Sequence, residues 1–478
     1  MRQFALNVPG LFVRVVALFS MMGFLMSCNS HSTSTSTTGA PGWGTPVLIE
    51  TNNGTALFPQ VAMDSNGNAI AVWMQTDVVT GRTNIWANRY VAETGWDVAQ
   101  LLETDDTGDA ALPRIAVDPV SESGLAVWQQ SDGTRTIIMA NHFDAASSAW
   151  GVAQSIETVT GSTGDAVTPQ VAMNSAGNGI AVWRQFEGTQ YHIMANTYTA
   201  GVGWGTAQAI ESNAGDAIAP QVALDSGGNA IAVWRQADGA QINVWVNRYA
   251  AGAWGATPQS FVPTDTVTTD TGDAAAPQVA VDPDGDGIVV WQQQQTPTTS
   301  TVNPPNDVWA THYSAASSSW DPTPRLLETA SGNAINPRIA MDDTGNGLAV
   351  WQQTDGARYN IWASRYAAGT GWATAQLIET DDTGNALVPQ IAVNQAGNGI
   401  ATWEQVSGDR TSVWVNRFTA ATSTAAAAWG TAARIQTTSG ADAFVPKVAI
   451  DPTDHGIAVW FQFDATNLVY NIWAIRSD

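Results

Sequence analysis

Three acidic side chains at alternate positions are the sharpest candidate for chemistry in this chain. The segment 282–287 reads DPDGDG, with carboxylates at Asp282, Asp284 and Asp286 and a glycine in sixth place. Oxygen ligands at alternate positions before a glycine are typical of the first half of a calcium-binding loop. The twelfth position of such a loop needs a carboxylate, and Gln293 stands there instead. A calcium site and a tight hairpin turn both remain open interpretations.

Other groups suited to catalysis are scarce, and calcium is the only cofactor that the sequence suggests. The five histidines are scattered, and a single cysteine cannot form an internal disulfide framework. There is no glycine-rich phosphate loop and no Gly-x-Ser-x-Gly nucleophile elbow. Carboxylates are abundant in segments 103–110 and 379–386, where an acid and a base could pair. Catalysis is therefore the alternative and not the main expectation.

A short repeated motif must position these residues. In its first copy the turn Asp64-Ser-Asn-Gly-Asn leads into an apolar segment that contains Trp73 and Gln75. The tryptophan recurs at spacings of 51 to 60 residues, as Trp73, Trp128, Trp183, Trp234, Trp291, Trp351, Trp403 and Trp460. A glutamine follows each of them by two positions. Residues repeated in every copy are most simply explained by packing and hydrogen bonding; the functional alternative is eight equivalent sugar pockets lined by tryptophan.

Each copy of the repeat predicts four short strands. In the first copy these are residues 59–64, 69–75, 84–90 and 95–103, which are rich in β-branched and aromatic residues between turn-forming segments. The second strand is apolar on both faces, as expected for a strand between packed sheets. Four-stranded units repeated at this period predict an all-β fold, an eight-bladed β-propeller.

The ends of the repeat array predict how the ring closes. Residues 42–50 form a lone fourth strand, and residues 471–477 form a final third strand without a fourth. The first strand can therefore complete the last blade, burying Trp43, Val47 and Ile49 and leaving no unpaired sheet edge. Residues 42–478 are accordingly predicted to form one propeller domain.

The repeated turn resembles a known family motif. The Asp-x-x-Gly-Asn turn before a tryptophan strand is similar to the Asp-box hairpins of sialidase-type propellers. The resemblance implies the fold but not the activity, because sialidases need an arginine triad, a tyrosine–glutamate nucleophile pair and an Arg-Ile-Pro signature. Here the segments PRIAVD at Pro113 and PRIAMD at Pro337 have those letters in another order.

The first 27 residues resemble a bacterial lipoprotein signal. Arg2 and Arg14 precede an apolar stretch. Leu25-Met26-Ser27 then leads to Cys28, as in a lipobox. The resemblance implies cleavage before Cys28 and lipid on that residue; an ordinary secretory signal with an incidental cysteine is the alternative. Residues 28–41 are a Ser/Thr-rich tether. Because Asn29 is not the aspartate that usually retains lipoproteins at the inner membrane, we expect the outer membrane or cell surface.

A ligand site is expected where the repeat is broken most, in the fifth blade. The loop leading into this blade, 263–277, is longer than its counterparts, and the loop 292–307 is the longest between second and third strands. Both should open on one face. The predicted ligand-binding residues are Asp265, Asp270, Asp273, Asn303, Asn306 and Asp307. Their chemistry favours hydroxyl-rich glycans, a cation or a basic protein patch.

The charge balance excludes one class of partner. With 18 basic and 42 acidic residues the formal net charge is -24, which repels nucleic acid. We expect a glycan or protein ligand, membrane contact through the lipid anchor only, and a monomer. The predicted function is non-catalytic binding or scaffolding at the cell surface. The alternative is a glycan-active hydrolase or lyase that uses acidic loops on the ring face.

Overall fold

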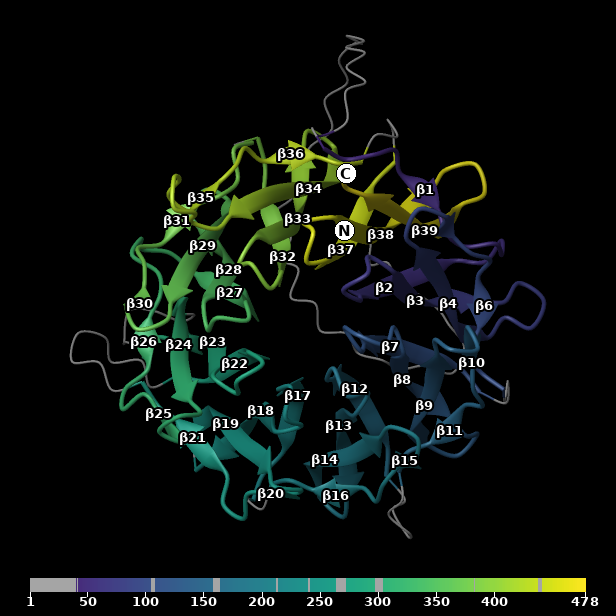
Figure 1. Cartoon of the computed structure of the whole chain (residues 1–478), viewed down its shortest axis with the longest axis horizontal. Coiled ribbons are helices and arrows are strands. Elements are labelled where there is room, and N and C mark those ends of the chain that lie inside the picture. The colour runs from purple at the N-terminus through teal and green to yellow at the C-terminus, as the bar shows by residue number, and fades with distance from the viewer. Residues whose placement is uncertain are drawn as a thin grey trace. The chain divides into compact units, whose positions relative to one another are not determined.

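Eight antiparallel sheets stand as blades around a central axis, which confirms the predicted eight-bladed propeller (Figure 1). The computed structural model describes residues 40, 42–104, 108–157, 164–211, 214–239, 241–263, 272–296, 304–381, 383–436 and 441–478. Cys28, Asp265, Asp270 and Asn303 lie outside these residues, as do segment 1–27 and nearly all of the tether. No helix able to cross a membrane occurs among the described residues.

Each blade runs outward from the axis in chain order. The innermost strands are β2 (Ala56–Met63), β7 (Ala110–Val117), β12 (Ala166–Met173), β17 (Ala217–Leu224), β22 (Ala274–Val281), β27 (Ala334–Met341), β32 (Ala386–Val393) and β37 (Ala443–Ile450). The second strands are β3 (Ala69–Thr76), β8 (Gly124–Ser131), β13 (Gly179–Glu187), β18 (Ala230–Asp238), β23 (Gly287–Gln294), β28 (Gly347–Thr354), β33 (Gly399–Ser407) and β38 (Gly456–Asp464). The third strands are β4 (Thr83–Val91), β9 (Thr136–Asp144), β14 (Gln190–Thr199), β19 (Gln241–Ala250), β24 (Asn306–Ser314), β29 (Tyr359–Ala367), β34 (Arg410–Thr419) and β39 (Val469–Arg476).

The outer strand differs from the prediction, because in seven blades it is split into two short pieces that pair with the same third strand. The first pieces are β5 (Gly95–Trp96), β10 (Ala149–Trp150), β15 (Gly203–Trp204), β20 (Ala253–Trp254), β25 (Ser319–Trp320), β30 (Gly371–Trp372) and β35 (Ala428–Trp429). The second pieces are β6 (Gln100–Leu101), β11 (Gln154–Ser155), β16 (Gln208–Ala209), β21 (Gln259–Phe261), β26 (Arg325–Leu326), β31 (Gln376–Leu377) and β36 (Ala433–Arg434). In the first blade the side-chain amide of Asn88 forms hydrogen bonds at the break between the two pieces. It donates to the carbonyl of Asp97 at 2.9 Å and to that of Ile49 at 2.8 Å.

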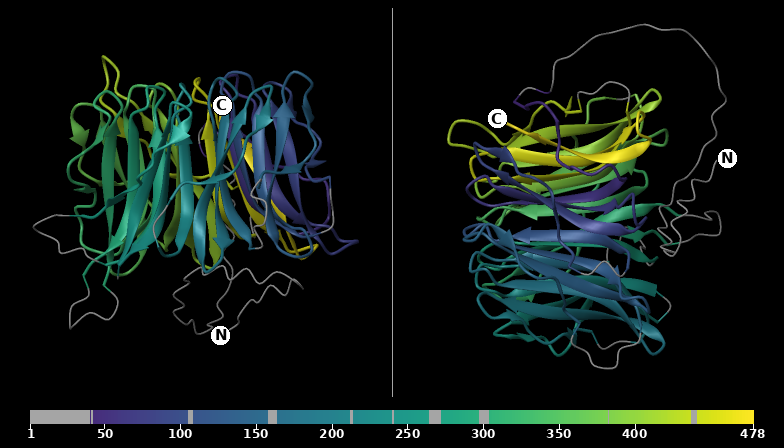
Figure 2. Two further views of the ribbon diagram at one scale, coloured as in Figure 1. Left: turned by 90° about the horizontal axis from the view of Figure 1, so that it is seen from below. Right: turned by 90° about the vertical axis from the view of Figure 1, so that its right-hand side faces the viewer.

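The chain ends close the ring in the eighth blade, as predicted. Strand β1 (Val47–Leu48) pairs antiparallel with β39, and Trp43 forms a bridge with Ser477. Figure 2 shows the purple start of the described propeller beside the yellow strands at its end. Trp43 and Ile49 are buried, at 7% and 2% exposure, but the expectation for Val47 is wrong because 43% of this residue is exposed. The reason is that β1 lies at the outer rim and the chain turns inward only after Leu48.

Every innermost strand contains the same β-bulge. The register with the second strand shifts there, as between Leu57 and Gln60 in β2. The residue before the strand proline is left-handed in every blade, with φ between 49° and 56° at Phe58, Leu112, Thr168, Ala219, Ala276, Asn336, Val388 and Val445. In the eighth blade a side chain of the seventh satisfies the freed amide, since Val445 N–H donates to the carboxylate of Glu404 at 2.7 Å. The eightfold repetition identifies the bulge as part of the fold.

The hydrophobic core consists of layers between neighbouring blades. The tryptophans of the second strands have no exposed surface, and each packs against the preceding blade. Trp128, for example, lies in a cluster with Ile70, Val72 and Ile85 of the first blade. Because one large flat side chain fills the gap between two twisted sheets, the same residue is needed at each of the eight junctions.

Candidate functional site

The repeated tryptophans and glutamines are engaged inside the blades. The indole N–H of Trp73 donates to the side-chain oxygen of Gln75 at 3.0 Å, and the equivalent bonds in the other blades measure 2.8–3.2 Å. The amide of Gln75 then donates to the carbonyls of Asn52 and Gly54 at 3.0 and 3.1 Å, in the turn that leads into the blade. These side chains therefore hold loops in place, and their polar atoms face the protein.

The aspartate and asparagine of the opening motif also have structural partners. The buried carboxylate of Asp64 accepts the backbone N–H groups of Asn66 and Asn68, at 2.9 and 2.8 Å, and the side-chain amide of Asn68 at 2.9 Å. The side-chain oxygen of Asn68 in turn accepts the backbone N–H of Ala92, in the turn after the third strand. The motif thus ties two turns of one blade together.

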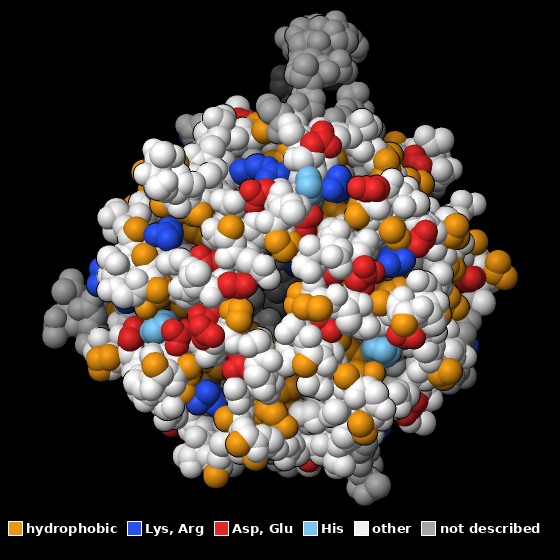
Figure 3. Space-filling model, viewed as in Figure 1, with side chains coloured by type: hydrophobic (Ala, Val, Ile, Leu, Met, Phe, Trp, Pro, Cys, Tyr) orange, Lys and Arg blue, Asp and Glu red, His pale blue; other side chains and the backbone are white. Residues whose placement is uncertain are grey.

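These motif turns form a ring at one mouth of the central channel, which we call the mouth ring. It comprises the eight turns between the innermost and second strands. Neighbouring turns are bonded across blades, since Ser65 N–H donates to Pro119 at 2.9 Å and the Ser226 hydroxyl donates to Pro283 at 2.5 Å. Figure 3 shows the surface hollowed at the centre of the propeller. Several neighbouring turns of the rim are therefore hydrogen-bonded to one another.

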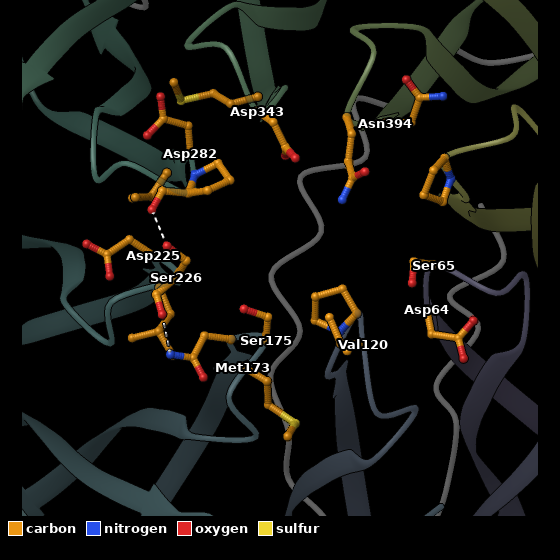
Figure 4. A pocket seen from close by; sticks show the side chains of 18 of the residues that line it. Asp64, Ser65, Val120, Met173, Ser175, Asp225, Ser226, Asp282, Asp343 and Asn394 are labelled. Carbon is orange, nitrogen blue, oxygen red and sulfur yellow. Dashed lines mark hydrogen bonds between the residues drawn. The ribbon is translucent and has the colours of Figure 1, made fainter.

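A cavity of about 430 Å³ opens within the mouth ring. Figure 4 shows side chains from different blades around a common opening. Those with exposed polar groups at the rim include Ser175, Ser226, Asp343 and Gln395. Apolar side chains at the ends of the innermost strands lie below them, among them Met63, Met173, Leu224 and Met341. A cavity of this size with an apolar floor and polar rim suits a ligand of small-molecule size or a protruding group of a larger one.

Sequence reasoning missed this cavity although its residues belong to the most visible motif. The signal was available, because the turn follows the strand nearest the axis in every blade and eight such turns must meet around one channel. The predicted site lies instead at the opposite ends of the strands. Strand β22 separates Asp273, before its start, from Asp282, after its end, which is about 30 Å at 3.3 Å per residue.

The described residues of the predicted fifth-blade site make contacts between blades. Asp273 accepts the N–H of Ile242 at 3.0 Å, and the same contact joins Asp109 to Thr83 at 2.9 Å in an earlier blade. Asn306 donates through its backbone and side chain to Asn333, at 2.7 and 3.0 Å. These two residues sit on the same face, as expected, and a role in binding ligand stays a prediction.

Asp307 belongs to a buried pair of acids. It is 6% exposed and accepts the side-chain amide of Gln295 at 3.0 Å on both oxygens. Its neighbour Glu328 is 7% exposed and accepts the N–H of Val308 at 2.8 Å. Burial, followed by the charge of Asp307 and its hydrogen bond, raises the pKa of Glu328 to about 9. Glu328 is therefore protonated at neutral pH.

The DPDGDG segment adopts the same turn as the other blades. One oxygen of Asp282 accepts the N–H groups of Asp284 and Asp286, at 3.0 and 2.9 Å, and Asp286 accepts the N–H of Ala315 at 2.7 Å. Burial raises the pKa of Asp282 to about 6. Across the described residues, no three acidic, histidine or cysteine side chains are grouped to hold a metal ion. Calcium binding by this turn stays a prediction.

Comparisons with known proteins bear on the fold. No family model matches this chain, and no curated protein is significantly similar to it in sequence. A protein of unknown function from Dyadobacter fermentans is similar in structure, with 12% identity, a TM-score of 0.42 and coverage of 91% of this chain and 99% of its own. An ulvan lyase from a new polysaccharide lyase family has 9% identity, a TM-score of 0.49 and coverage of 76% and 93%.

A Hadza microbial sialidase is also similar, with 12% identity, a TM-score of 0.37 and coverage of 63% of this chain. The present chain spans 63% of the length of that sialidase. At such identities a likeness concerns the fold alone, and sialidases and lyases both occur among these similar structures. The eight-bladed β-propeller fold itself follows from the sheet topology of the chain.

Proposed function

We propose that this protein is a non-catalytic binding or scaffold propeller, lipid-anchored through Cys28 at the outer membrane or cell surface, which holds a glycan or protein ligand at the mouth ring. The observation that carries the proposal is the cavity of about 430 Å³ within a rim of turns bonded to one another across blades. A rim built this way is held in place before the ligand arrives, so binding costs little ordering of the site.

The chemistry of the rim supports a polar ligand. Ser175, Ser226 and Gln395 present exposed hydroxyl and amide groups, and Asp343 adds a carboxylate. Such groups can hydrogen-bond sugar hydroxyls or the polar groups of a peptide segment. The apolar floor suits the nonpolar face of a sugar ring or an apolar side chain. The proposed site therefore fits either member of the predicted ligand class.

The proposal is tested by filling the mouth. Ser175→Trp places a large side chain at the opening, and Val202→Trp is the matched control, because Val202 is 84% exposed in the outer turn of the same blade. The wild type and both variants are applied to glycan and protein-fragment arrays. The mouth site is supported if the affinity for an array ligand falls tenfold or more in S175W and is unchanged in V202W. Equal binding by all three proteins would place the ligand elsewhere on the ring.

One observation favours a second candidate function, a glycan-active hydrolase or lyase. A carboxylic acid whose pKa is raised to about 9, as that of Glu328 is, can act as a general acid at neutral pH. Glu328 and its neighbour Asp307 are both more than nine-tenths buried, which leaves little room for a substrate. Glycan release by the wild type that disappears in Glu328→Gln would establish this candidate in place of the first.

A further inference from the structure

The innermost strands, which surround the channel, carry a second ring of side chains, one from each blade. The residue after the strand proline occupies the same position in all eight blades, and we call this set the channel ring. Its members are Gln60, Arg114, Gln170, Gln221, Gln278, Arg338, Gln390 and Lys447. Five blades thus carry glutamine, and three carry a cation. Arg114 precedes Asp118 of the mouth ring by four residues, so the channel ring lies about 13 Å below it at 3.3 Å per residue.

The three cations lie two blades apart along one half of the ring. Arg114 belongs to the second blade, Arg338 to the sixth and Lys447 to the eighth. In a ring of eight the second and sixth blades face each other, and the eighth lies midway between them. Arg114 and Arg338 therefore stand on innermost strands at opposite sides of the axis, and the charge of Arg338 contributes to lowering the pKa of Arg114. The cations therefore surround one shared space.

No acidic side chain neutralises these charges within the described residues. Burial is the main cause that lowers the pKa of Arg114 and Arg338 to about 10, and it also lowers that of Lys447, helped by repulsion from both arginines. Their hydrogen bonds go to neutral groups instead. Arg114 donates to Gln170 at 3.1 Å, Lys447 donates to Gln390 at 3.1 Å, and Arg338 donates to the carbonyl of Pro337 at 3.0 Å. In a chain with 42 acidic residues this is an exceptional environment.

Hydrogen-bond donors without an acceptor remain between the cations. Among the described residues Arg338 donates through one of its side-chain nitrogens. The side-chain nitrogen of Gln390 is buried there without an acceptor. A buried donor without an acceptor is costly, and buried like charges without a counter-ion are more so. Both costs disappear when an anion with several oxygen atoms lies between the cations, where guanidinium groups form paired hydrogen bonds with it.

We propose that the channel ring is an anion-binding site in which Arg114, Arg338 and Lys447 hold a small oxyanion, or the anionic group of a larger ligand, with Gln390 as an additional donor. The shared chemistry is a sulfate, phosphate or carboxylate group. The inference does not depend on the proposed function, because the anion site lies in the channel and can fill with or without a ligand at the mouth.

The test uses the full chain and three simple anions. Sulfate, phosphate and acetate are titrated separately by calorimetry against a chloride background of matched ionic strength, which separates tetrahedral anions from carboxylates. The variants are Arg338→Gln, Lys447→Gln and the triple change that also includes Arg114→Gln. Each places in the ring the glutamine that five blades already carry, so folding should be preserved. Arg434→Gln removes an exposed cation from an outer strand and is the control.

We expect at least one anion to bind the wild type and the control with equal affinity. The same anion should bind each single variant at least tenfold more weakly. It should not bind the triple variant. Without the anion, the triple variant should melt at a higher temperature than the wild type, because the repulsion is gone. With the anion, only the wild type and the control should gain stability. Absence of binding to the wild type, or equal binding by the triple variant, overturns the proposal. If the triple variant fails to fold, the two single variants decide.

Discussion

The indole nitrogen of Trp183 lies 3.0 Å from the side-chain oxygen of Gln185, which is two residues later on the same face of β13. Both side chains have no measurable exposure, and the Gln185 amide donates to the carbonyl of Gly164 at 3.3 Å. The pair thus connects the core of a blade to the loop that enters it. The same bond in every blade gives the ring its most regular polar contact.

Replacing Gln185 by Leu should destabilise the propeller without affecting ligand binding at the mouth. The change leaves the indole N–H of Trp183 and the carbonyl of Gly164 without this partner inside the protein, which costs about 1–3 kcal/mol. The measurement is urea denaturation followed by tryptophan fluorescence. Val202→Trp, at an exposed turn, should leave the free energy of unfolding nearly unchanged and serves as control. An equally stable Q185L protein would mean that the bond is energetically neutral.

Removing residues 42–50 should destabilise the ring far more than removing residues 29–41. The first deletion exposes the edge of β39 and eliminates the burial of Trp43 and Ile49, each worth about 1.5–3 kcal/mol. The second removes the tether, in which Ala40 is the one described residue and is buried beside Trp43. Thermal melting of both truncated proteins gives the comparison, and equal melting temperatures would contradict closure of the ring by β1.

The acid pair in the fifth blade should make stability depend on pH. The pKa of Glu328 rises from 4.5 to about 9 in the folded protein, so between these values the folded state keeps a proton that the unfolded state releases. Stability from this group is therefore greatest below pH 4.5 and falls as the pH rises toward 9.

Asp307→Asn should raise the free energy of unfolding at neutral pH by about 1–3 kcal/mol and flatten this dependence, since one pKa unit is worth about 1.4 kcal/mol. Asparagine is also the residue at the equivalent positions Asn84, Asn243 and Asn360. Asp284→Asn removes an exposed carboxylate and is the control. The check is chemical denaturation over a series of pH values; an unchanged pH profile in D307N would show that the two acids do not interact.

Shortening segment 294–305 to the length of another blade's loop decides between the two faces. If the ligand binds at the mouth ring, as we propose, affinity should be unchanged, because this loop lies at the other ends of the strands. A loss of about tenfold, equal to about 1.4 kcal/mol, would instead support the predicted fifth-blade site. The affinity is measured with a ligand that the wild type binds on the arrays. Thermal melting confirms that the shortened protein is folded.

Cys28→Ser should release the protein from membranes, because the lipid on this cysteine is the only anchor that the sequence predicts. The measurement is the distribution of the protein between membrane and soluble fractions of the expressing cells. Ser27→Ala, beside the cysteine, is the matched control and should leave the protein in the membrane fraction. Unchanged membrane association of C28S would refute the lipoprotein interpretation.

Repetition made the fold predictable from sequence, and the same repetition hid the sites. Trp73 and its seven equivalents reveal the blade count, and the lone strand containing Trp43 reveals the closure. The bulge was not predictable, because the left-handed residue before the proline varies from Phe58 to Thr168 to Asn336 and is never glycine. Arg114, Arg338 and Lys447 look like isolated substitutions for glutamine until the ring places them around one axis.

Pairing of β1 with β39 also has a consequence for the order of events in biosynthesis. The first strand of the propeller to be made is the last to find its partner, because β39 is the last propeller strand to be synthesised. Seven blades can form as the chain emerges, but the circle stays open until the terminal strand arrives. A prematurely ended chain therefore keeps an exposed sheet edge, and proteases and chaperones can distinguish it from the finished molecule by that edge alone.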